Sequence, residues 1–550
     1  MVSQRKASDL FVECLEAEGV KYVFGIPGEE TLDLNESLER SSIEFVPVRH
    51  EQGGAYMADA YGRLTRSAGV CLGTLGPGAT NLVTGVADAY LDHAPLVALT
   101  GQANLERMHK ESHQYIDVVA LMRPIVKWNA QVNSPAIIPE AVRKAFKVAQ
   151  SQKPGPTHLE LPEDVMEAET EGEPLPHRSE FRRPEPSATE LELAARIVRA
   201  AEHPVVLAGN GVLRVGAAPA LREFAHATGI PVAETFMGKG AMDFTDELAM
   251  GTVGLQDRDY ALAGFEDADV VITVGYDLVE HAPVHWNPDR DKRIVCIDTA
   301  SVEVDQHYVT EIDLIGDLEV ILSRLGETCG PVVSRGGASS RLNEIVTRYF
   351  EDSRDDDSFP VRPPRALWEL RQALDRCDIL VSDVGLHKLW IARMFPAYEP
   401  NTVLIANGLA GMGFALPSAI GAKLAHPDRN VVTVNGDGGF LMNCQELETA
   451  VRLGLPIVNV IWENRQFGSI VWKQDRKFGR HFGVDFTNPD FVGLAESFGC
   501  AGLRCESVGD FASHLGQALT LDMPSVIVVP IDYSVDVTIS EELGRETVAT

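Results

Sequence analysis

The sequence predicts an α/β protein made of three doubly wound parallel-sheet domains. Its 550 residues exceed what one hydrophobic core accommodates, so several domains are expected. Short apolar runs typical of buried strands alternate with helix-like segments along the whole chain. The clearest strand-like runs are YVFGI, FVPV, GVCLGTL, LVALTG, PVVLAGNG, VVITVG, IVCID, ILVSDVG, NVVTVNGDG and IVNVIW.

Two polar stretches interrupt this alternation and divide the chain. Residues around 166–188 are rich in Glu, Pro and Arg, and residues around 330–363 combine Gly and Ser with an acidic run. Both compositions are typical of connections between domains. The expected domains are therefore residues 1–165, 189–330 and 361–550.

Composition excludes several classes of partner. Hydrophobic content is 45% and charged content 23%, which is ordinary for a globular protein. A net charge of −32 opposes binding to nucleic acid or to an anionic membrane. The sequence shows neither a signal-peptide core nor an apolar stretch of about 18 residues. We expect a cytoplasmic protein with no nucleic-acid or membrane partner.

The most informative motif surrounds Asp437. This carboxylate follows the strand-like run NVVTVN and is flanked by Gly436 and Gly438. A helix-like segment and a second apolar run, PIVNVIW, lead from there to Asn464. One right-handed crossover joins the two strands, so Asp437 and Asn464 should be neighbours at the ligand-binding edge of a sheet. Two oxygen donors beside glycine N–H groups suit Mg²⁺ that holds a diphosphate.

Three other residues are ambiguous when each is considered alone. Glu51 lies between the run FVPV and Gly53-Gly54, where an acidic residue commonly begins a helix. Met412 lies in a glycine-rich turn before an apolar helix, as many core methionines do. His387 follows the run ILVSDVG, where a histidine is often simply exposed.

Taken together, these motifs resemble thiamine-diphosphate enzymes of the acetolactate synthase and pyruvate oxidase family. The family motif is Gly-Asp-Gly, about two dozen residues, then Asn-Asn; here 24 residues separate Gly438 from Glu463, which replaces the first Asn. The stretches GIPG (Gly25–Gly28) and LGPGATNLVTGVADAY (Leu75–Tyr90) also match. The similarity extends from Ser8 to about Val537, and it is greatest to catabolic, FAD-independent acetolactate synthases.

The resemblance implies a fold, a cofactor and roles for particular residues. The three domains would be pyrimidine-binding, central and pyrophosphate-binding. Mg²⁺ would be held by the side chains of Asp437 and Asn464 and the carbonyl of Gln466. Glu51 would activate thiamine diphosphate through its aminopyrimidine ring. The cofactor-binding residues would be Pro27, Gly28, Gly385, Leu386, His387, Ala410, Met412, Gly438 and Gly439.

In the family, the glutamate and the metal-binding aspartate meet across a subunit interface. The resemblance therefore implies a homodimer or homotetramer with two chains at each active site. It also implies a 2-oxo acid substrate that loses CO₂. The remaining carbon unit is then protonated to an aldehyde, added to a second oxo acid, or oxidised by flavin.

Gln114 favours the second of these outcomes. Related decarboxylases carry paired histidines for proton transfer, whereas this chain has His113-Gln114. A glutamine orients a carbonyl but cannot act as a general acid. We therefore expect two pyruvates to be joined into 2-acetolactate with release of CO₂. The alternatives are a decarboxylase that releases an aldehyde, a flavin-dependent oxidase, and a catalytically silent binding protein, against which Glu51 and Asp437 argue.

Flavin is expected to be absent. LAGNGVLRVGAAPAL contains glycines after a strand but lacks the Gly-x-Gly-x-x-Gly spacing. Flavin-binding relatives carry an Arg-containing stretch where this chain has GYDLVEHAPVHWN. Two residues are assigned to substrate binding: Trp472, which either narrows the acceptor pocket or packs in a lid helix, and Arg258, which would anchor a carboxylate. Glu29-Glu30 replace a lysine of catabolic relatives.

Overall fold

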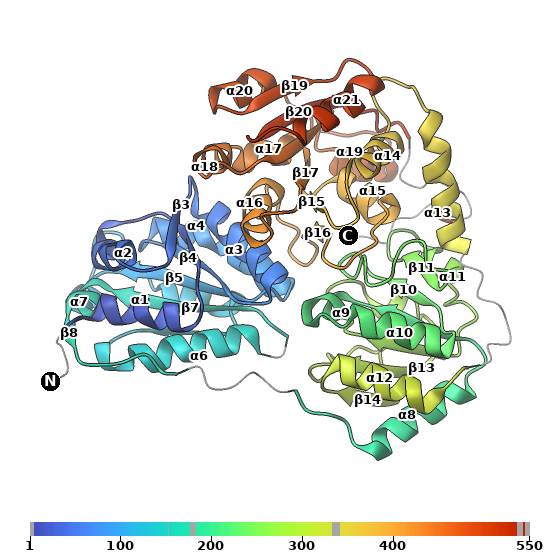
Figure 1. Ribbon diagram of the computed structural model, residues 1–550, viewed down its shortest axis with the longest axis horizontal. Coiled ribbons are helices and arrows are strands. Elements are labelled where there is room, and N and C mark those ends of the chain that lie inside the picture. Colours follow the sequence, from blue (N-terminus) through green and yellow to red (C-terminus); the bar gives the residue numbers. More distant parts are fainter. Residues whose placement is uncertain (1–4, 152, 177–182, 333–340, 536–542, 545–550) are drawn as a thin grey trace.

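The fold is that of a computed structural model, which describes residues 5–151, 153–176, 183–332, 341–535 and 543–544. Three six-stranded sheets, each wholly parallel, follow one another along the chain (Figure 1). Every strand-like run singled out in the sequence contributes to one of them. The predicted α/β class with three doubly wound domains is therefore confirmed.

The N-terminal sheet is built from residues 22–162, and helices cover both of its faces. Its strands in sheet order are β3 (Glu44–Pro47), β2 (Tyr22–Gly25), β4 (Gly69–Gly73), β5 (Leu96–Gln102), β7 (Pro156–Pro162) and β6 (Trp128–Gln131). The main helices are α1 (Ala7–Ala17), α2 (Leu32–Glu39), α3 (Glu51–Thr65), α4 (Pro77–Leu91), α5 (Val118–Met122), α6 (Ile138–Gln150) and α7 (Glu163–Glu167).

The central sheet is built from residues 204–315. Its strands in sheet order are β11 (Ala249–Thr252), β10 (Val232–Glu234), β9 (Pro204–Ala208), β12 (Val270–Val274), β13 (Arg293–Asp298) and β14 (Ile312–Ile315). The helices are α8 (Ala188–Ala200), α9 (Asn210–Val215), α10 (Ala218–Thr228), α11 (Asp259–Leu262) and α12 (Leu318–Cys329).

The C-terminal sheet is built from residues 379–530. Its strands in sheet order are β16 (Val403–Ile405), β15 (Ile379–Ser382), β17 (Val431–Gly436), β18 (Ile457–Glu463), β20 (Ser525–Pro530) and β19 (Ala501–Arg504). The helices are α13 (Arg341–Asp352), α14 (Pro363–Ala373), α15 (Leu386–Met394), α16 (Ala415–Ala425), α17 (Asp437–Asn443), α18 (Glu446–Arg452), α19 (Gly468–Phe478), α20 (Phe491–Ser497) and α21 (Val508–Ala518).

The connection expected around 330–363 is only partly irregular. Residues 333–340 lie outside the described residues, but α13 follows them as a regular helix. Leu342, Ile345, Val346 and Phe350 recur at helical spacing and pack into the core. The connection between the domains thus contains a helix that the sequence did not indicate, because the neighbouring Gly, Ser and acidic residues obscure this apolar stripe. In the segment around 166–188, β8 (Glu169–Thr170) pairs with β1 (Arg5–Lys6).

The three domains are packed against one another, which fixes the surroundings of the site. α16 lies against α3, and one hydrophobic core contains residues from both the N-terminal and the C-terminal domain (Figure 1). The central and C-terminal domains share a buried ion pair in which Arg393 Nη2 lies 2.8 Å from both carboxylate oxygens of Asp259. Removal of either partner would cost about 3–5 kcal/mol, because it leaves a buried charge uncompensated. Among the described residues, no helix has the length and apolar character needed to span a membrane.

Candidate active site

Asp437 is the first residue of α17 and directly follows β17. Its buried carboxylate accepts hydrogen bonds from the backbone amides of Asn464 (3.0 Å), Arg465 and Gly438 (2.9 Å), and from the side-chain amide of Asn488 (2.9 Å). Because β17 and β18 are parallel neighbours, their carboxyl ends meet as the crossover rule predicted. Four N–H donors thus fix the orientation of this carboxylate.

A cavity of about 210 Å³ opens beside Asp437, and it collects the sites predicted in the C-terminal domain. Its walls come from the turn before α15, the loop before α16, the start of α17 and the segment that follows β18. The predicted residues that line it are Gly385, Leu386, His387, Ala410, Met412, Asp437, Gly438, Gly439, Asn464 and Gln466. These residues were selected from three separate sequence motifs, and the fold makes them neighbours.

His387 occupies the first turn of α15 and lines this cavity. It is buried rather than exposed, and its Nε2 has no hydrogen-bond partner among the described residues. Burial lowers the pKa of His387 to about 3, so the imidazole is neutral at physiological pH. A buried ring nitrogen without a partner is a group that a bound ligand would satisfy. The adjoining helix N-terminus offers N–H groups to an anion such as a diphosphate.

The loop that carries Ala410 and Met412 is held from two sides. Ala410 adopts a left-handed backbone conformation (φ +57°), which is strained for a residue other than glycine and is typical of functional sites. On one side, the amide of Gly411 donates to Asp88 of α4 (3.4 Å). On the other side, the carboxylate of Asp383 accepts hydrogen bonds from the amides of Gly413 (2.9 Å) and Phe414 (3.2 Å).

Glu51 is buried at the first position of α3, as the sequence predicted. Its Oε2 accepts a hydrogen bond from the side-chain amide of Asn81 in α4 (2.9 Å). A side chain at Gly78 would come within 3.2 Å of Oε1, so glycine leaves that oxygen accessible. Asn81 therefore positions the carboxylate and Gly78 keeps space in front of it.

Gln114 contacts the same turn as Glu51, although the two residues are distant in sequence. Both Gln114 (φ +58°) and Gly76 (φ +51°) adopt left-handed conformations, and a side chain at Gly76 would come within 2.5 Å of the Gln114 carbonyl. The segment from Gly76 to Gly78 therefore contacts both Gln114 and Glu51. Gly28, next to Pro27, packs against Thr74 at the start of this segment.

The two groups of residues are separate within one chain. Every residue that lines the 210 Å³ cavity lies between 384 and 533, and Glu51, Gln114 and Gly28 are not among them. Large apolar side chains on the elements around the cavity are exposed, namely Leu409, Met442, Phe467 and Ile470. Exposed apolar groups beside a binding cavity are typical of an interaction surface.

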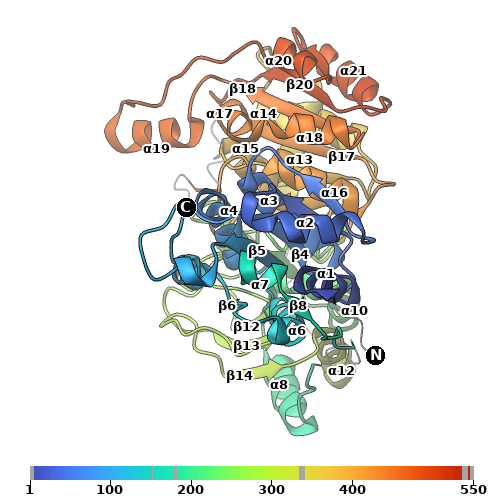
Figure 2. The same cartoon turned by 90° about the vertical axis from the view of Figure 1, so that its left-hand side faces the viewer.

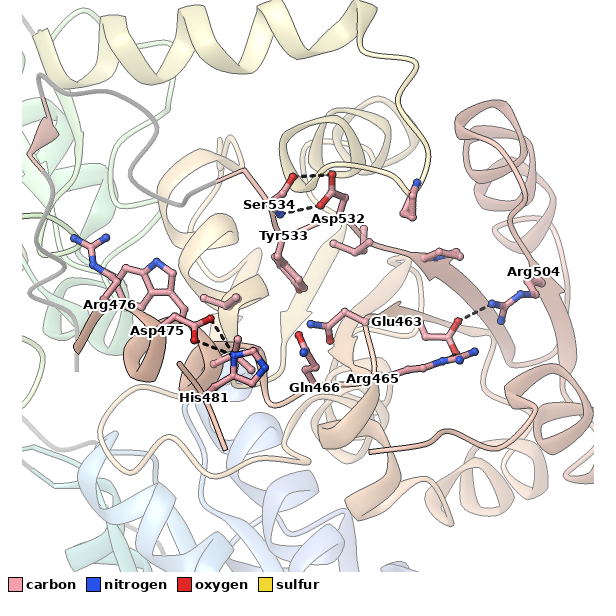
Figure 3. A pocket seen from close by; sticks show the side chains of 18 residues that line it. Glu463, Arg465, Gln466, Asp475, Arg476, His481, Arg504, Asp532, Tyr533 and Ser534 are labelled. Atoms are coloured by element: carbon pink, nitrogen blue, oxygen red, sulfur yellow. Dashed lines mark hydrogen bonds and ion pairs between the residues drawn. The ribbon is translucent and has the colours of Figure 1, made fainter. Parts of the chain in front are cut away.

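A larger cavity of about 730 Å³ (Figure 3) adjoins the smaller one, and the two share Leu386, Asn464, Gln466, Gly468 and Tyr533. Trp472 lines this larger cavity, and the guanidinium of Arg476 lies 4.8 Å from the centre of its ring. Both residues belong to α19, which projects from the domain and has no buried residue (Figure 2). This position suits both roles predicted for Trp472, which are to narrow the acceptor pocket or to pack in a lid helix.

Glu463, which replaces the first Asn of the family motif, is buried and forms an ion pair with Arg504. Its carboxylate accepts a hydrogen bond from Arg504 (2.6 Å; Figure 3). It accepts another from the side-chain amide of Asn488 (3.2 Å). Asn488 donates to Asp437 as well, so it links the replaced residue to the predicted metal ligand. Sequence reasoning missed Asn488, because it follows α19 in a loop without any recognisable pattern.

Arg258 is exposed in the central domain, where its amide donates to the carbonyl of Leu543 (3.4 Å). It lines neither of the two cavities described above. Its role as a carboxylate anchor stays a prediction that these contacts do not support.

The predicted donors fit Mg²⁺ and a diphosphate. Asp437, Asn464 and Gln466 line one cavity and supply only oxygen ligands, the kind that Mg²⁺ prefers. In the described part of the chain, no group of three or more His, Cys, Asp or Glu side chains is arranged to hold a metal ion. The unpartnered His387 nitrogen and the N-terminus of α15 face the same space, where a diphosphate would satisfy them.

Comparison with known proteins agrees with this geometry. Residues 5–121, 191–325 and 383–529 match the N-terminal TPP binding domain, the central domain and the C-terminal TPP binding domain of thiamine pyrophosphate enzymes. The fold and the site thus define a thiamine-diphosphate-dependent enzyme.

Within that class, the chain belongs to the acetolactate synthase family. It is 36% identical to an acetolactate synthase of Bacillus subtilis over 99% of this chain and 96% of that protein. It is 35% identical to a probable acetolactate synthase large subunit of Methanococcus aeolicus, over 96% and 92%. Identity to a catabolic acetolactate synthase of Raoultella terrigena is also 35%, over 96% and 95%.

Proposed function

We propose that the protein joins two pyruvate molecules into 2-acetolactate with release of CO₂, using Mg²⁺ and thiamine diphosphate. The observation that carries this proposal is the convergence of ten predicted cofactor and metal residues on one cavity of about 210 Å³. Similarity over nearly the whole length to enzymes named acetolactate synthase supports the choice of reaction.

Each residue has a defined task in this proposal. Asp437, Asn464 and the carbonyl of Gln466 hold Mg²⁺, and the start of α15 binds the diphosphate. Thiamine diphosphate, when bound, supplies the electron sink that decarboxylation of a 2-oxo acid requires. Glu51 hydrogen-bonds the aminopyrimidine ring and holds a proton there, while Asn81 keeps its carboxylate in place.

Gln114 directs the reaction towards carbon–carbon bond formation. Its amide orients the carbonyl of the second oxo acid by a hydrogen bond. It has no proton to deliver at neutral pH, so release of an aldehyde is not promoted. The resulting product is a 2-hydroxy-2-methyl-3-oxo acid.

The proposed enzyme works without flavin. The turn after β9, where a dinucleotide phosphate would approach, is filled by protein. The amide of Asn210 donates to Glu280 (3.0 Å), and a side chain at Gly211 would come within 2.5 Å of the backbone of Gly275. A buried carboxyl group in that place does not fit a phosphate, so no step of the mechanism involves FAD.

The proposed active site needs two chains. Glu51 and Gln114 belong to one part of the chain and the metal ligands to another. In a homodimer or a dimer of dimers, the N-terminal domain of one protomer would cover the C-terminal cavity of its partner. The exposed Leu409, Met442, Phe467 and Ile470 would be buried by this contact.

The test is identification of the reaction products. Purified protein is incubated with Mg²⁺, thiamine diphosphate and [¹³C]pyruvate in the absence of flavin, and the products are followed by NMR. Acetolactate is expected, with acetoin after acid treatment. Acetaldehyde alone would identify a decarboxylase instead. Failure to consume pyruvate would contradict the proposed substrate.

A further inference from the structure

A third cavity, of about 550 Å³, lies between the N-terminal and central domains. It is formed where the C-terminal end of α3 meets the C-terminal end of α9, and Arg66 at the end of α3 donates a hydrogen bond to the carbonyl of Val215 at the end of α9. None of its lining residues contributes to either cavity of the candidate active site.

The lining of this cavity is strongly cationic. Its charged residues are all arginines: Arg63, Arg66, Arg183 and Arg214. His93 also lines it, and burial, followed by the charge of Arg214, lowers the pKa of His93 to about 4. The histidine is therefore neutral at physiological pH. Four guanidinium groups around one space are unexpected in a chain with a net charge of −32.

These guanidinium groups are only partly compensated by the carboxylates around them. Arg214 forms an ion pair with the buried Asp277, which Lys153 also contacts (2.9 Å). Arg183 lies 3.8 Å from Asp317, too far for a hydrogen bond. The Nε atoms of Arg183 and Arg214 are buried without a hydrogen-bond partner among the described residues. A buried N–H donor without an acceptor destabilises the folded protein, and a bound ligand that accepts the hydrogen bond would remove this cost.

Arg66 and Arg63, at the C-terminal end of α3, differ in how many carboxylates face them. Arg66 donates to the carbonyl of Val215 (3.1 Å) and has no carboxylate partner within the described ranges. Arg63 lies 3.7 Å from Asp92 and 3.9 Å from Asp59. Burial raises the pKa of Asp59 to about 7, so near neutral pH this carboxyl group is partly protonated. Arg66 thus presents a guanidinium group to the cavity without a carboxylate of the described residues opposite it, whereas Asp59, Asp92, Asp277 and Asp298 lie behind the other basic groups.

We propose that this cavity is an effector site for a phosphorylated metabolite of about mononucleotide size. Its volume falls in the range of small-molecule sites, which is about 300–1,000 Å³. Guanidinium groups bind phosphate oxygens in pairs and form charge-assisted hydrogen bonds with them. The rest of the lining is Gly62, Pro95, Pro154 and Val215, which suit an apolar or aromatic portion, and Gln150, whose amide can hydrogen-bond a polar group.

Arg63 connects this cavity to the candidate active site. It also donates to the carbonyl of Ile405 (3.2 Å), just before the loop that carries Ala410 and Met412. The carboxylate of Asp92, which lies 3.7 Å from Arg63, accepts hydrogen bonds from the backbone amides of Asn407 (3.2 Å) and Gly408 (2.6 Å) in the same loop. A ligand that draws Arg63 into the cavity would weaken its contacts with Ile405 and Asp92, which hold this loop. Because the loop carries Ala410 and Met412, the reaction rate would change.

The test uses the full-length protein saturated with Mg²⁺ and thiamine diphosphate, so that the diphosphate site of the enzyme is already filled. ADP and pyrophosphate are titrated by calorimetry in excess Mg²⁺. Saturable binding is expected, and Arg66→Gln or Arg183→Gln should weaken it about tenfold or more. Arg196→Gln, on the exposed face of α8, is the matched control and should bind as the wild type does.

A second measurement compares the initial rate of pyruvate consumption with and without ADP. A change is expected in the wild type and in Arg196→Gln but not in Arg66→Gln. The rate measurement rests on the proposed function, whereas calorimetry does not. Failure of the effector site and failure of the proposed function are therefore distinguishable. The absence of saturable binding of both probes, or unchanged binding by both arginine variants, would overturn the site. Binding without any change of rate would overturn its role as an effector site.

Discussion

Glu446 in α18 accepts a hydrogen bond from the backbone amide of His50, the residue before the candidate catalytic Glu51 (3.1 Å). The same carboxylate oxygen accepts the amide of Arg49 (3.0 Å). A side chain at Gly53 would come within 2.7 Å of this oxygen, so glycine permits the close approach. The C-terminal domain of a chain thus fixes the start of α3 in its own N-terminal domain.

Glu446 should make the stability of the protein depend on pH. Burial raises the pKa of Glu446 to about 7, well above the value in an unfolded chain. The folded state therefore binds the proton more tightly, and the free energy of unfolding falls as the pH rises from about 4.5 to 7. This contribution amounts to about 3 kcal/mol.

Glu446→Gln should remove that part of the pH dependence. Urea unfolding at a series of pH values would show a flatter profile than the wild type has. Glu496→Gln, on the exposed face of α20, is the control and should keep the wild-type slope. Equal slopes for Glu446→Gln and the wild type would refute this assignment.

Glu51→Gln should abolish most of the activity while the cofactor still binds. Glutamine keeps the shape of the side chain and the contact with Asn81 but cannot share a proton with the aminopyrimidine ring. We expect kcat to fall by about 100-fold or more. The exposed Glu44→Gln on β3 is the control. Full turnover by Glu51→Gln would refute the proposed mechanism.

Asn488→Ala should weaken Mg²⁺ binding although Asn488 is not itself proposed as a ligand. Its side-chain amide holds the carboxylates of Asp437 and Glu463 together, and loss of such an orienting partner costs about 10–100-fold in metal affinity. Titration of Mg²⁺ in the presence of thiamine diphosphate, followed by intrinsic fluorescence, measures this. Gln474→Ala in α19 should leave the affinity unchanged. An unaltered Mg²⁺ affinity of the Asn488→Ala protein would show that Asn488 does not orient the metal ligand.

Gln114→His should shift the products from acetolactate towards acetaldehyde. The imidazole would titrate near neutral pH and supply the proton that glutamine lacks. NMR of the products gives the ratio directly, and His113→Gln at the neighbouring position is the control. If the ratio did not change, Gln114 would not determine the fate of the two-carbon unit.

Local patterns predicted the fold class and most of the C-terminal site. Asp437 and Asn464 end consecutive strands, so the crossover rule was enough to place them together. Apolar runs were likewise enough to identify the strands that form the centre of each sheet. The sequence did not indicate α13, whose apolar stripe is hidden by polar neighbours.

The site residues that the sequence did not indicate act through contacts between positions far apart in the chain. Asn488, Glu446 and Arg504 act through partners 25 to 397 residues away, and no periodicity links such positions. The arginines around the third cavity come from two domains and from the segment that connects them, so only the packing of these parts reveals them. Charge counted over the whole chain predicted the opposite character for this region.

The most direct test of the account is complementation between two inactive variants. Glu51→Gln and Asp437→Ala proteins are mixed, subunit exchange is verified by native mass spectrometry, and acetolactate formation is measured. If the two groups of residues meet between subunits, each mixed dimer contains one intact site and activity is recovered. If activity stays absent although mixed dimers have formed, the two groups must act within one chain, and the proposed two-chain active site is wrong.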